Sequence, residues 1–206
     1  MAPFFSIILP TYNRAALLPN AIRSVIGQTF STWELLIVDD GSIVHTEDIL
    51  SKFTQDDKRI FKYTLSHRGH IRAKNYAIDL ANGRYITFLD SDDTYKPEHL
   101  EIYYSYLKNE DIDLLYSTPE IIGNEYVPDI NNPSEMVHIS QCKVGGTFAV
   151  KSKIIKKAKG FPLVNYGEDT LFFTNLKNMN TNIVKSDFSS YIYNRTQNDS
   201  ITKKII

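Results

Sequence analysis

The sequence contains one cysteine, Cys142, and no apolar stretch that could span a membrane. A single thiol excludes an internal disulfide and any zinc site built from several cysteines. The longest early apolar run, residues 4–10, is far shorter than the roughly 20 residues of a membrane helix. No basic segment precedes it, as one would in a signal peptide. We therefore expect a cytoplasmic protein, with any membrane contact made peripherally at the inner face of the membrane.

Charge of either sign is also not in excess, since 23 basic and 24 acidic side chains leave a net charge of -1. This balance excludes nucleic-acid binding driven by bulk charge. With 206 residues, 42% of them hydrophobic and 23% charged, general disorder is excluded as well. The chain lacks an internal repeat, a linker and a Gly-x-Gly-x-x-Gly motif after any predicted strand. We therefore expect one domain that is not a dinucleotide-dependent dehydrogenase.

In the first half of the chain, short continuous apolar runs alternate with segments whose apolar residues have helical spacing. Strands are predicted at residues 5–9, 35–38, 61–65, 85–89 and 114–116, and helices at 15–28, 46–53, 71–81 and 97–108. This order predicts an α/β fold of three layers, with a mostly parallel, Rossmann-like central sheet and helices on both of its faces. In the less regular second half we expect an excursion or mixed hairpin at 122–140, strands at 145–150, 183–184 and 191–193, and helices at 151–159 and 170–177.

Three of the predicted strands end in polar segments, at residues 11–14, 39–42 and 90–93. In such sheets ligands bind beyond the carboxyl ends of the strands, so the topology gathers these segments at one edge. Two carboxylates in an Asp-x-Asp pair suit Mg²⁺ or Mn²⁺, although Asp and Ser are also common in turns. Crowded carboxylates repel one another, and this repulsion favours a bound cation at residues 90–93.

Five short motifs stand in order along the chain: Pro10-Thr11-Tyr12-Asn13-Arg14, Val38-Asp39-Asp40-Gly41-Ser42, Gly69-x-x-x-Ala73-x-Asn75, Asp90-Ser91-Asp92-Asp93 and Gly167-Glu168-Asp169. Together they resemble the ordered motifs of the family 2 glycosyltransferases of GT-A fold, over residues 3–195. The resemblance implies a single GT-A domain over residues 1–206. Its nucleotide-binding half would end near residue 108 and its acceptor-binding half would follow.

The resemblance also implies a reaction, the transfer of a sugar from a nucleotide donor, commonly a UDP-sugar, to a hydroxyl of a glycan or lipid-linked acceptor, with inversion at the anomeric carbon. Asp169 matches the general base of the family, and Glu168 lies beside it. Asp92 matches the carboxylate that holds the divalent cation, Mn²⁺ or Mg²⁺, and Asp90 matches one near the ribose and a metal-bound water. Asp40 is expected at the nucleobase.

The remaining donor contacts implied by the resemblance lie in the same motifs and near the C-terminus. They are Pro10, Thr11, Tyr12, Arg14, Asp39 as a neighbouring support, Arg72, Asn75, Ser91 and, as a phosphate-binding group, Arg195. The chemistry agrees with these roles, because a cation neutralises a departing diphosphate and an acceptor hydroxyl needs a nearby carboxylate. A single displacement needs no enzyme nucleophile, and no nucleophile motif is evident.

Two other functions share part of this pattern. A sugar-phosphate nucleotidyltransferase also uses paired carboxylates and Mg²⁺, but it would carry a glycine- and lysine-rich phosphate loop after the first strand, where residues 11–14 read Thr-Tyr-Asn-Arg. A non-catalytic module that binds a nucleotide-sugar is the other alternative, and the presence of both Asp92 and Asp169 argues against it.

Outside these motifs, the five lysines of residues 151–159 predict an exposed helix face or a surface attracted to an anionic acceptor or membrane. His67 and His70 lack soft partners for zinc, so we expect them on a loop, either in contact with the donor or without a role. Trp33 precedes a predicted strand and is expected in the core.

Overall fold

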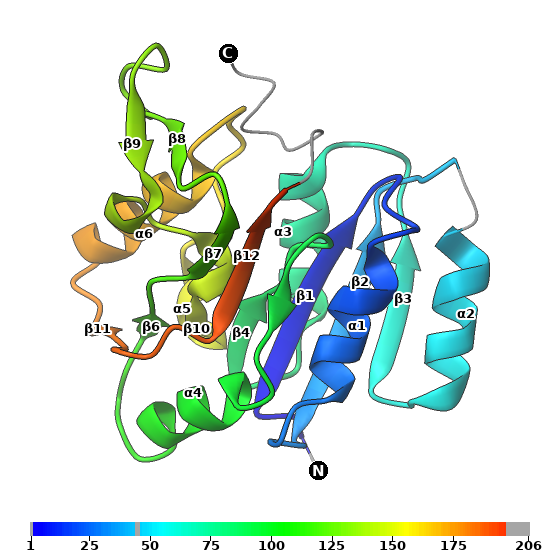
Figure 1. The fold of residues 1–206 in the computed structure, drawn as a ribbon. Coiled ribbons are helices and arrows are strands. Elements are labelled where there is room, and N and C mark those ends of the chain that lie inside the picture. Colours follow the sequence, from blue (N-terminus) through cyan, green and yellow to red (C-terminus); the bar gives the residue numbers. More distant parts are fainter. Residues whose placement is uncertain (1, 44–45, 197–206) are drawn as a thin grey trace.

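Our computed structural model describes residues 2–43 and 46–196. A seven-stranded sheet in the order β11-β6-β10-β4-β1-β2-β3 forms its middle layer (Figure 1). The strands are β1 (Phe5–Thr11), β2 (Trp33–Asp39), β3 (Ile60–Thr64), β4 (Tyr85–Phe88), β6 (Leu114–Tyr116), β10 (Ala149–Lys151) and β11 (Ile183–Lys185). All pairings are parallel except those of β10, so the predicted mostly parallel sheet is confirmed.

Helices cover both faces of this sheet and complete the predicted three layers (Figure 1). On one face α1 (Leu18–Ile26), α2 (Thr46–Asp56) and α4 (His99–Leu107) pack on the odd-numbered side chains of β1, such as Ile7. On the other face α3 (His70–Leu80), α5 (Ser152–Lys157) and α6 (Glu168–Asn178) pack with Ile8. Within the described residues no helix is long and apolar enough to cross a membrane.

Every residue of β1 and β2 is buried, because both strands are covered on both faces. Their parallel register pairs Thr11 with Asp39 at the carboxyl ends. Beyond the strands, the Asp40 N–H donates to the Thr11 carbonyl (2.9 Å) and the Leu89 N–H after β4 donates to the Ile8 carbonyl (2.9 Å). The polar segments that follow these three strands therefore share one edge of the sheet, as predicted.

Two small sheets extend this edge. A three-stranded sheet in the order β5-β12-β7 joins β5 (Thr94–Tyr95), β12 (Tyr191–Arg195) and β7 (Glu120–Gly123). The hairpin of β8 (Tyr126–Pro128) and β9 (Met136–His138) forms the predicted excursion and leads into a 3₁₀ turn, η1 (Ile139–Gln141). Trp33 is buried, as predicted, and the Arg59 guanidinium lies 3.7 Å from its ring centroid.

Two expectations for the second half are wrong. The strand predicted at 145–150 is a 3₁₀ turn, η2 (Gly145–Thr147), followed by the short antiparallel β10, because the Gly145 N–H donates to Asp169 rather than to a neighbouring strand. The predicted lysine helix begins after Lys151, which instead ends β10. Lys151 is buried and pairs with Asp111 and Asp113, so it is not part of an exposed basic face.

A buried carboxylate ties the sheet together at the edge opposite the strands' carboxyl ends. Glu34 in β2 accepts hydrogen bonds from the Ser6 hydroxyl (2.6 Å) and the Asn82 N–H (2.7 Å). The Gly83 N–H in turn donates to the Ser6 oxygen (2.7 Å), which fixes the turn before β4. These contacts connect β1, β2 and the chain entering β4.

We expect Glu34→Ala to lower the free energy of unfolding by about 3 kcal/mol, because it leaves the buried Ser6 hydroxyl and the part-buried Asn82 N–H without their acceptor. Urea unfolding followed by circular dichroism measures this loss. Glu101→Ala, on the exposed side of α4, serves as the control and should change stability by less than about 0.5 kcal/mol. Equal stability of the two variants would contradict the structural role of Glu34.

Candidate active site

A cavity of about 850 Å³ opens beyond the carboxyl ends of β1, β2 and β4. The start of α3, the start of α6 and the β8–β9 hairpin complete its wall. It brings together ten residues singled out in the sequence: Pro10, Thr11, Tyr12, Arg14, Asp40, Asp90, Ser91, Asp92, Glu168 and Asp169. Segments that are up to about 160 positions apart in the sequence thus face one space.

The other four candidate residues lie outside the cavity lining. Asp39 accepts hydrogen bonds from the N–H (3.0 Å) and the hydroxyl (2.5 Å) of Ser42, so it supports the loop after β2. Asn75 pairs through its amide with the main chain of Phe161, at 2.8 and 2.9 Å, and so secures the segment after α5. Arg72 lies on the exposed side of α3.

Arg195, the fourth, is buried in β12 with its guanidinium 5.7 Å from the ring centroid of Tyr193, which does line the cavity. Its Nε and Nη1 atoms have no hydrogen-bond partner within residues 2–43 and 46–196. A buried cation with unused donors is a group that can bind an anion, although here it stands behind the cavity wall.

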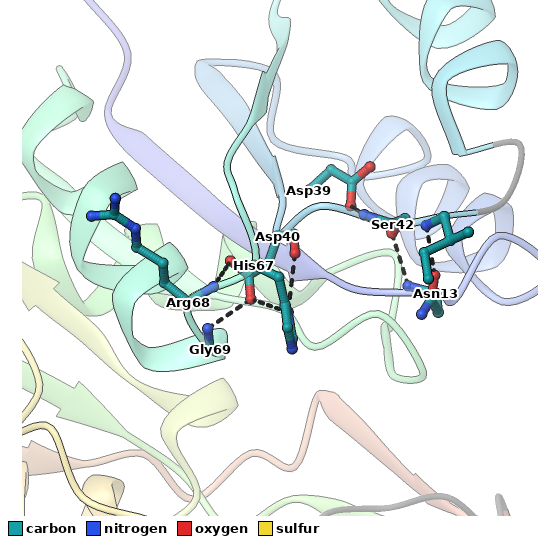
Figure 2. A network of polar contacts seen from close by, with 8 residues as sticks. Asn13, Asp39, Asp40, Ser42, His67, Arg68 and Gly69 are labelled. Carbon is teal, nitrogen blue, oxygen red and sulfur yellow. Dashed lines mark hydrogen bonds and ion pairs between the residues drawn. The ribbon is translucent and has the colours of Figure 1, made fainter.

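Asp40 organises the loop that leads into α3 (Figure 2). Its carboxylate accepts hydrogen bonds from the N–H groups of Arg68 (2.8 Å) and Gly69 (2.8 Å), and Nδ1 of His67 lies 3.0 Å away. Gly69 has φ 97°, a conformation that favours glycine. The His67 ring stacks on the ring of Tyr12, with centroids 3.9 Å apart. Asp40 therefore faces the cavity and also shapes its rim.

The acidic segment after β4 divides its carboxylates between the cavity and the interior. Asp93 turns inward, where it accepts hydrogen bonds from the Tyr191 hydroxyl (2.5 Å) and the Asn194 N–H (2.8 Å). Burial raises the pKa of Asp93 well above its usual range, and the charges of Asp90 and Asp92 raise it further. Asp90 and Asp92 themselves line the cavity.

The carboxylates of the cavity can hold a divalent cation only when a bound ligand supplies further oxygen atoms to complete its coordination. Nowhere in the described chain do three or more His, Cys, Asp or Glu side chains form a group that could hold a metal. Two carboxylates, Asp90 and Asp92, are nevertheless the number with which proteins commonly hold Mg²⁺ against substrate phosphates. The Arg14 guanidinium, 3.2 Å from Asp92 Oδ2, adds positive charge at the same wall.

Lys74 is a site residue that the sequence did not reveal. It lies on α3, is only 3% exposed, and its Nζ is 3.6 Å from Asp90 Oδ1 and 3.9 Å from Glu168 Oε1. Burial alone would lower the pKa of Lys74, but the charges of Asp90, Asp169 and Glu168 outweigh it and raise the pKa above the usual range. The ammonium group therefore stays charged and balances the carboxylates around it.

Asp169 and Glu168 are adjacent carboxyls with opposite pKa shifts. The Gly145 N–H donates to Asp169 Oδ2 (2.7 Å), while Oδ1 is shielded from solvent and has no hydrogen-bond partner in the described chain. Burial raises the pKa of Asp169 to about 7; Glu168 and Asp90 add to this, whereas Lys74 and the Gly145 N–H oppose it. Burial would also raise the pKa of Glu168, but the hydrogen bond from His70 and the charge of Lys74 outweigh it and lower that pKa.

This arrangement can remove a proton from a bound molecule. Asp169 lines the cavity, and no donor in the described chain engages its Oδ1, so the carboxyl keeps lone pairs for a proton, as a general base requires. A pKa raised to about 7 brings its basicity close to neutral pH. Two cations, Lys74 and Arg14, line the same cavity near Asp90 and Asp92 and suit a ligand that carries negative charge.

A family model described as "Glycosyl transferase family 2" matches residues 6–162, more than half of the chain. Among curated proteins, the chain is similar to WfgD of Escherichia coli, named a UDP-Glc:alpha-D-GlcNAc-diphosphoundecaprenol beta-1,3-glucosyltransferase. The two are 31% identical over 204 residues, which cover 97% of this chain and 80% of WfgD.

Two solved structures share the fold. TarS 1-349 of S. aureus, in complex with UDP-GlcNAc, matches 96% of this chain and 60% of its own, with a TM-score of 0.80 and 24% identity. The mannosyltransferase PcManGT from Pyrobaculum calidifontis, in complex with GDP-Man and Mn2+, matches 93% of this chain and 57% of its own, with a TM-score of 0.74 and 17% identity. This chain thus spans less than two thirds of either solved chain.

The pKa shifts of the two adjacent carboxyls predict opposite effects on stability. Because the pKa of Asp169 is higher in the folded state, its contribution to stability is complete below the unfolded value of 3.8 and is lost as the pH rises through about 7. We expect Asp169→Asn to stabilise the fold at pH 8 by on the order of 1 kcal/mol.

Urea titrations between pH 5 and pH 8.5 measure this difference, which should widen up to about pH 7 and then level off. Glu168→Gln is the matched variant with the opposite sign. The ionised Glu168 has a lowered pKa and stabilises the fold above its unfolded value of 4.5, so its removal should destabilise the protein across this range. Two variants that shift stability in the same direction would contradict the assigned charges.

Proposed function

The chain belongs to glycosyl transferase family 2, and on that premise we propose that it transfers a sugar from a UDP-sugar to a hydroxyl group of a glycan or glycolipid, with inversion at the anomeric carbon. It is a nucleotide-sugar glycosyltransferase with a fold of GT-A type, as predicted. One observation carries the proposal for the site: Asp40, Asp92 and Asp169, from three separate segments, line one cavity.

The donor is proposed to bind over the ends of β1, β2 and β4. Pro10, Thr11, Tyr12 and Asp40 form the nucleoside side, because they line the wall next to the Tyr12–His67 stack. The choice of UDP is supported by the names of two similar proteins, since WfgD is named for UDP-Glc and TarS was solved with UDP-GlcNAc. Arg72, Asn75 and Arg195 remain predictions as donor contacts.

Asp90 and Asp92 are proposed to hold a Mn²⁺ or Mg²⁺ ion together with the donor diphosphate. When bound, such a cation neutralises the charge that develops on the departing diphosphate. Support comes from the hard oxygen ligands at this wall and from PcManGT, whose structure contains Mn2+. Arg14 and Lys74 flank the two carboxylates and add positive charge to the same region.

The proposed reaction is a single displacement. The Asp169 carboxylate takes the proton of the acceptor hydroxyl, whose oxygen forms a bond to the anomeric carbon of the donor sugar. The bond from that carbon to the diphosphate oxygen breaks, and the electron pair leaves with the nucleoside diphosphate. The Gly145 N–H holds Oδ2 of Asp169 in place, so the base keeps its orientation during the proton transfer.

The acceptor is proposed to enter along the β8–β9 side of the cavity. Aliphatic side chains from this hairpin and the segment after it, among them Val127, Ile130 and Val137, line that wall. WfgD is named for an acceptor linked to diphosphoundecaprenol, which supports a lipid-linked sugar. Peripheral membrane contact through the region of Lys151–Lys159 remains a prediction, now limited to its exposed lysines, Lys153, Lys156, Lys157 and Lys159.

Turnover and its pH dependence test the assignment of the base. We expect Asp169→Asn to lower kcat by a factor of about 10²–10⁴, because the general base is lost. In the unsubstituted enzyme, kcat should rise with pH through about 7, where the Asp169 carboxyl ionises. Release of UDP from UDP-sugars in the presence of acceptors measures both effects. Asp79→Asn, on the exposed side of α3, is the control, and full activity of Asp169→Asn would refute the assignment.

Binding of UDP tests the cation site without turnover. We expect calorimetry to give an affinity for UDP at least tenfold higher with Mn²⁺ than with EDTA, because Asp90 and Asp92 would hold an ion that neutralises the diphosphate. Asp92→Asn should lose most of this enhancement, whereas Asp79→Asn should keep it. The same affinity with and without metal in the unsubstituted protein would mean that the donor binds without a cation.

A further inference from the structure

A histidine bridges the two halves of the cavity. His70, the first residue of α3, places Nε2 3.0 Å from Oε1 of Glu168, the first residue of α6. Both side chains line the cavity, and both are largely shielded from solvent. The contact joins the nucleotide-binding half to the segment that carries the proposed base.

Lys74 reinforces this contact from the same helix. Residues four positions apart lie on one face of a helix, so His70 and Lys74 point from α3 in the same direction. Both approach the same oxygen, Glu168 Oε1, at 3.0 Å and 3.9 Å. The Lys74 ammonium group divides its charge between Asp90 and Glu168, whereas the His70 ring pairs with Glu168. The hydrogen bond from His70 is therefore the directional part of this interaction.

The start of α6 needs such a tether. The helix begins after Gly167, which is in the left-handed conformation and provides no side-chain cap. Among the contacts that hold this turn are the Gly145 N–H on Asp169, the Tyr166 hydroxyl on the Pro128 carbonyl (2.6 Å), and His70 and Lys74 on Glu168. The contacts of His70 and Lys74 come from α3, on the donor side of the cavity, and that of His70 is the shorter.

We propose that His70 is a positioning residue of the transfer reaction: by holding Glu168 it orients the first turn of α6, so that the Asp169 carboxyl faces the acceptor hydroxyl. The inference rests on the proposed function and adds to it a residue that acts through Glu168. The charged and titratable groups that face Asp169 from the surrounding elements are Glu168, Lys74, Asp90 and Tyr193. His70 influences how these groups are arranged around Asp169, but it does not itself contact the reacting atoms.

A double-mutant cycle tests whether His70 acts through Glu168. The variants are His70→Ala, Glu168→Gln and the two combined, with His70→Gln as the conservative replacement, because its amide reaches as far as Nε2. We expect His70→Ala to lower kcat by 10- to 100-fold while the calorimetric affinity for UDP changes by less than threefold. The combined variant should be no slower than the slower single variant, because both substitutions break the same contact. His70→Gln should recover most of the lost kcat.

Two controls keep the outcomes separable. Asp79→Ala on the exposed side of α3 should behave like the unsubstituted protein, and His70→Leu replaces the alanine variant in the cycle if the latter melts below the assay temperature. The inference is overturned if the fold-losses in kcat of His70→Ala and Glu168→Gln multiply in the combined variant. It is also overturned if the affinity of His70→Ala for UDP falls as much as its kcat. If the unsubstituted protein itself lacks turnover, the proposed function fails. If it turns over and the kcat losses of the two single variants are independent, only the role of His70 is rejected.

Discussion

The cavity depends on one buried ammonium group. Lys74 is almost fully shielded from water, and it faces Asp90 from the end of β4 and Glu168 and Asp169 from α6. Carboxylates that share a poorly solvated space repel one another, and a central cation offsets that repulsion. The two walls of the cavity are thereby coupled electrostatically, since each of them contributes acidic groups to the same lysine. The opposite pKa shifts of Glu168 and Asp169 arise although Lys74 lowers both values: burial dominates at Asp169, whereas the hydrogen bond from His70 adds to Lys74 at Glu168.

Much of the fold could be predicted because its central strands are buried on both faces. The continuous apolar runs of β1 and β2 and the helical periodicity of α1 and α3 are local signals, and the α/β order of the first half follows from them. The reversal of β10 could not be predicted, because the turn before it is set by contacts distant in sequence. Gly145 donates to Asp169, and Gly146 packs so closely against Tyr191 that a side chain there would collide with its ring.

The candidate site divides in the same way. Topology brings together the carboxylates at strand ends, so Asp40, Asp90 and Asp92 could be placed at one edge from the sequence. The roles of Lys74, His67 and His70 depend on which elements face them across the cavity, and that information is tertiary. A weak signal existed for Lys74, since it stands next to Ala73 and among Ile71, Ala77 and Ile78 on the buried side of α3. Asn75 and Arg72 belong to the motif that points to the family, but the structure places Asn75 against the segment after α5 and Arg72 at the exposed surface.

The engagement of Asp40 has a consequence for changing the nucleotide preference of this enzyme. Its carboxylate already accepts hydrogen bonds from Arg68 and Gly69 and contacts His67, so few of its lone pairs are left for a ligand. Replacing Asp40 to favour another base would also release the segment that begins α3 and carries His70. The proposed contact with the base and the architecture of the loop thus fall on one side chain, and a redesign must alter residues 67–69 together with residue 40.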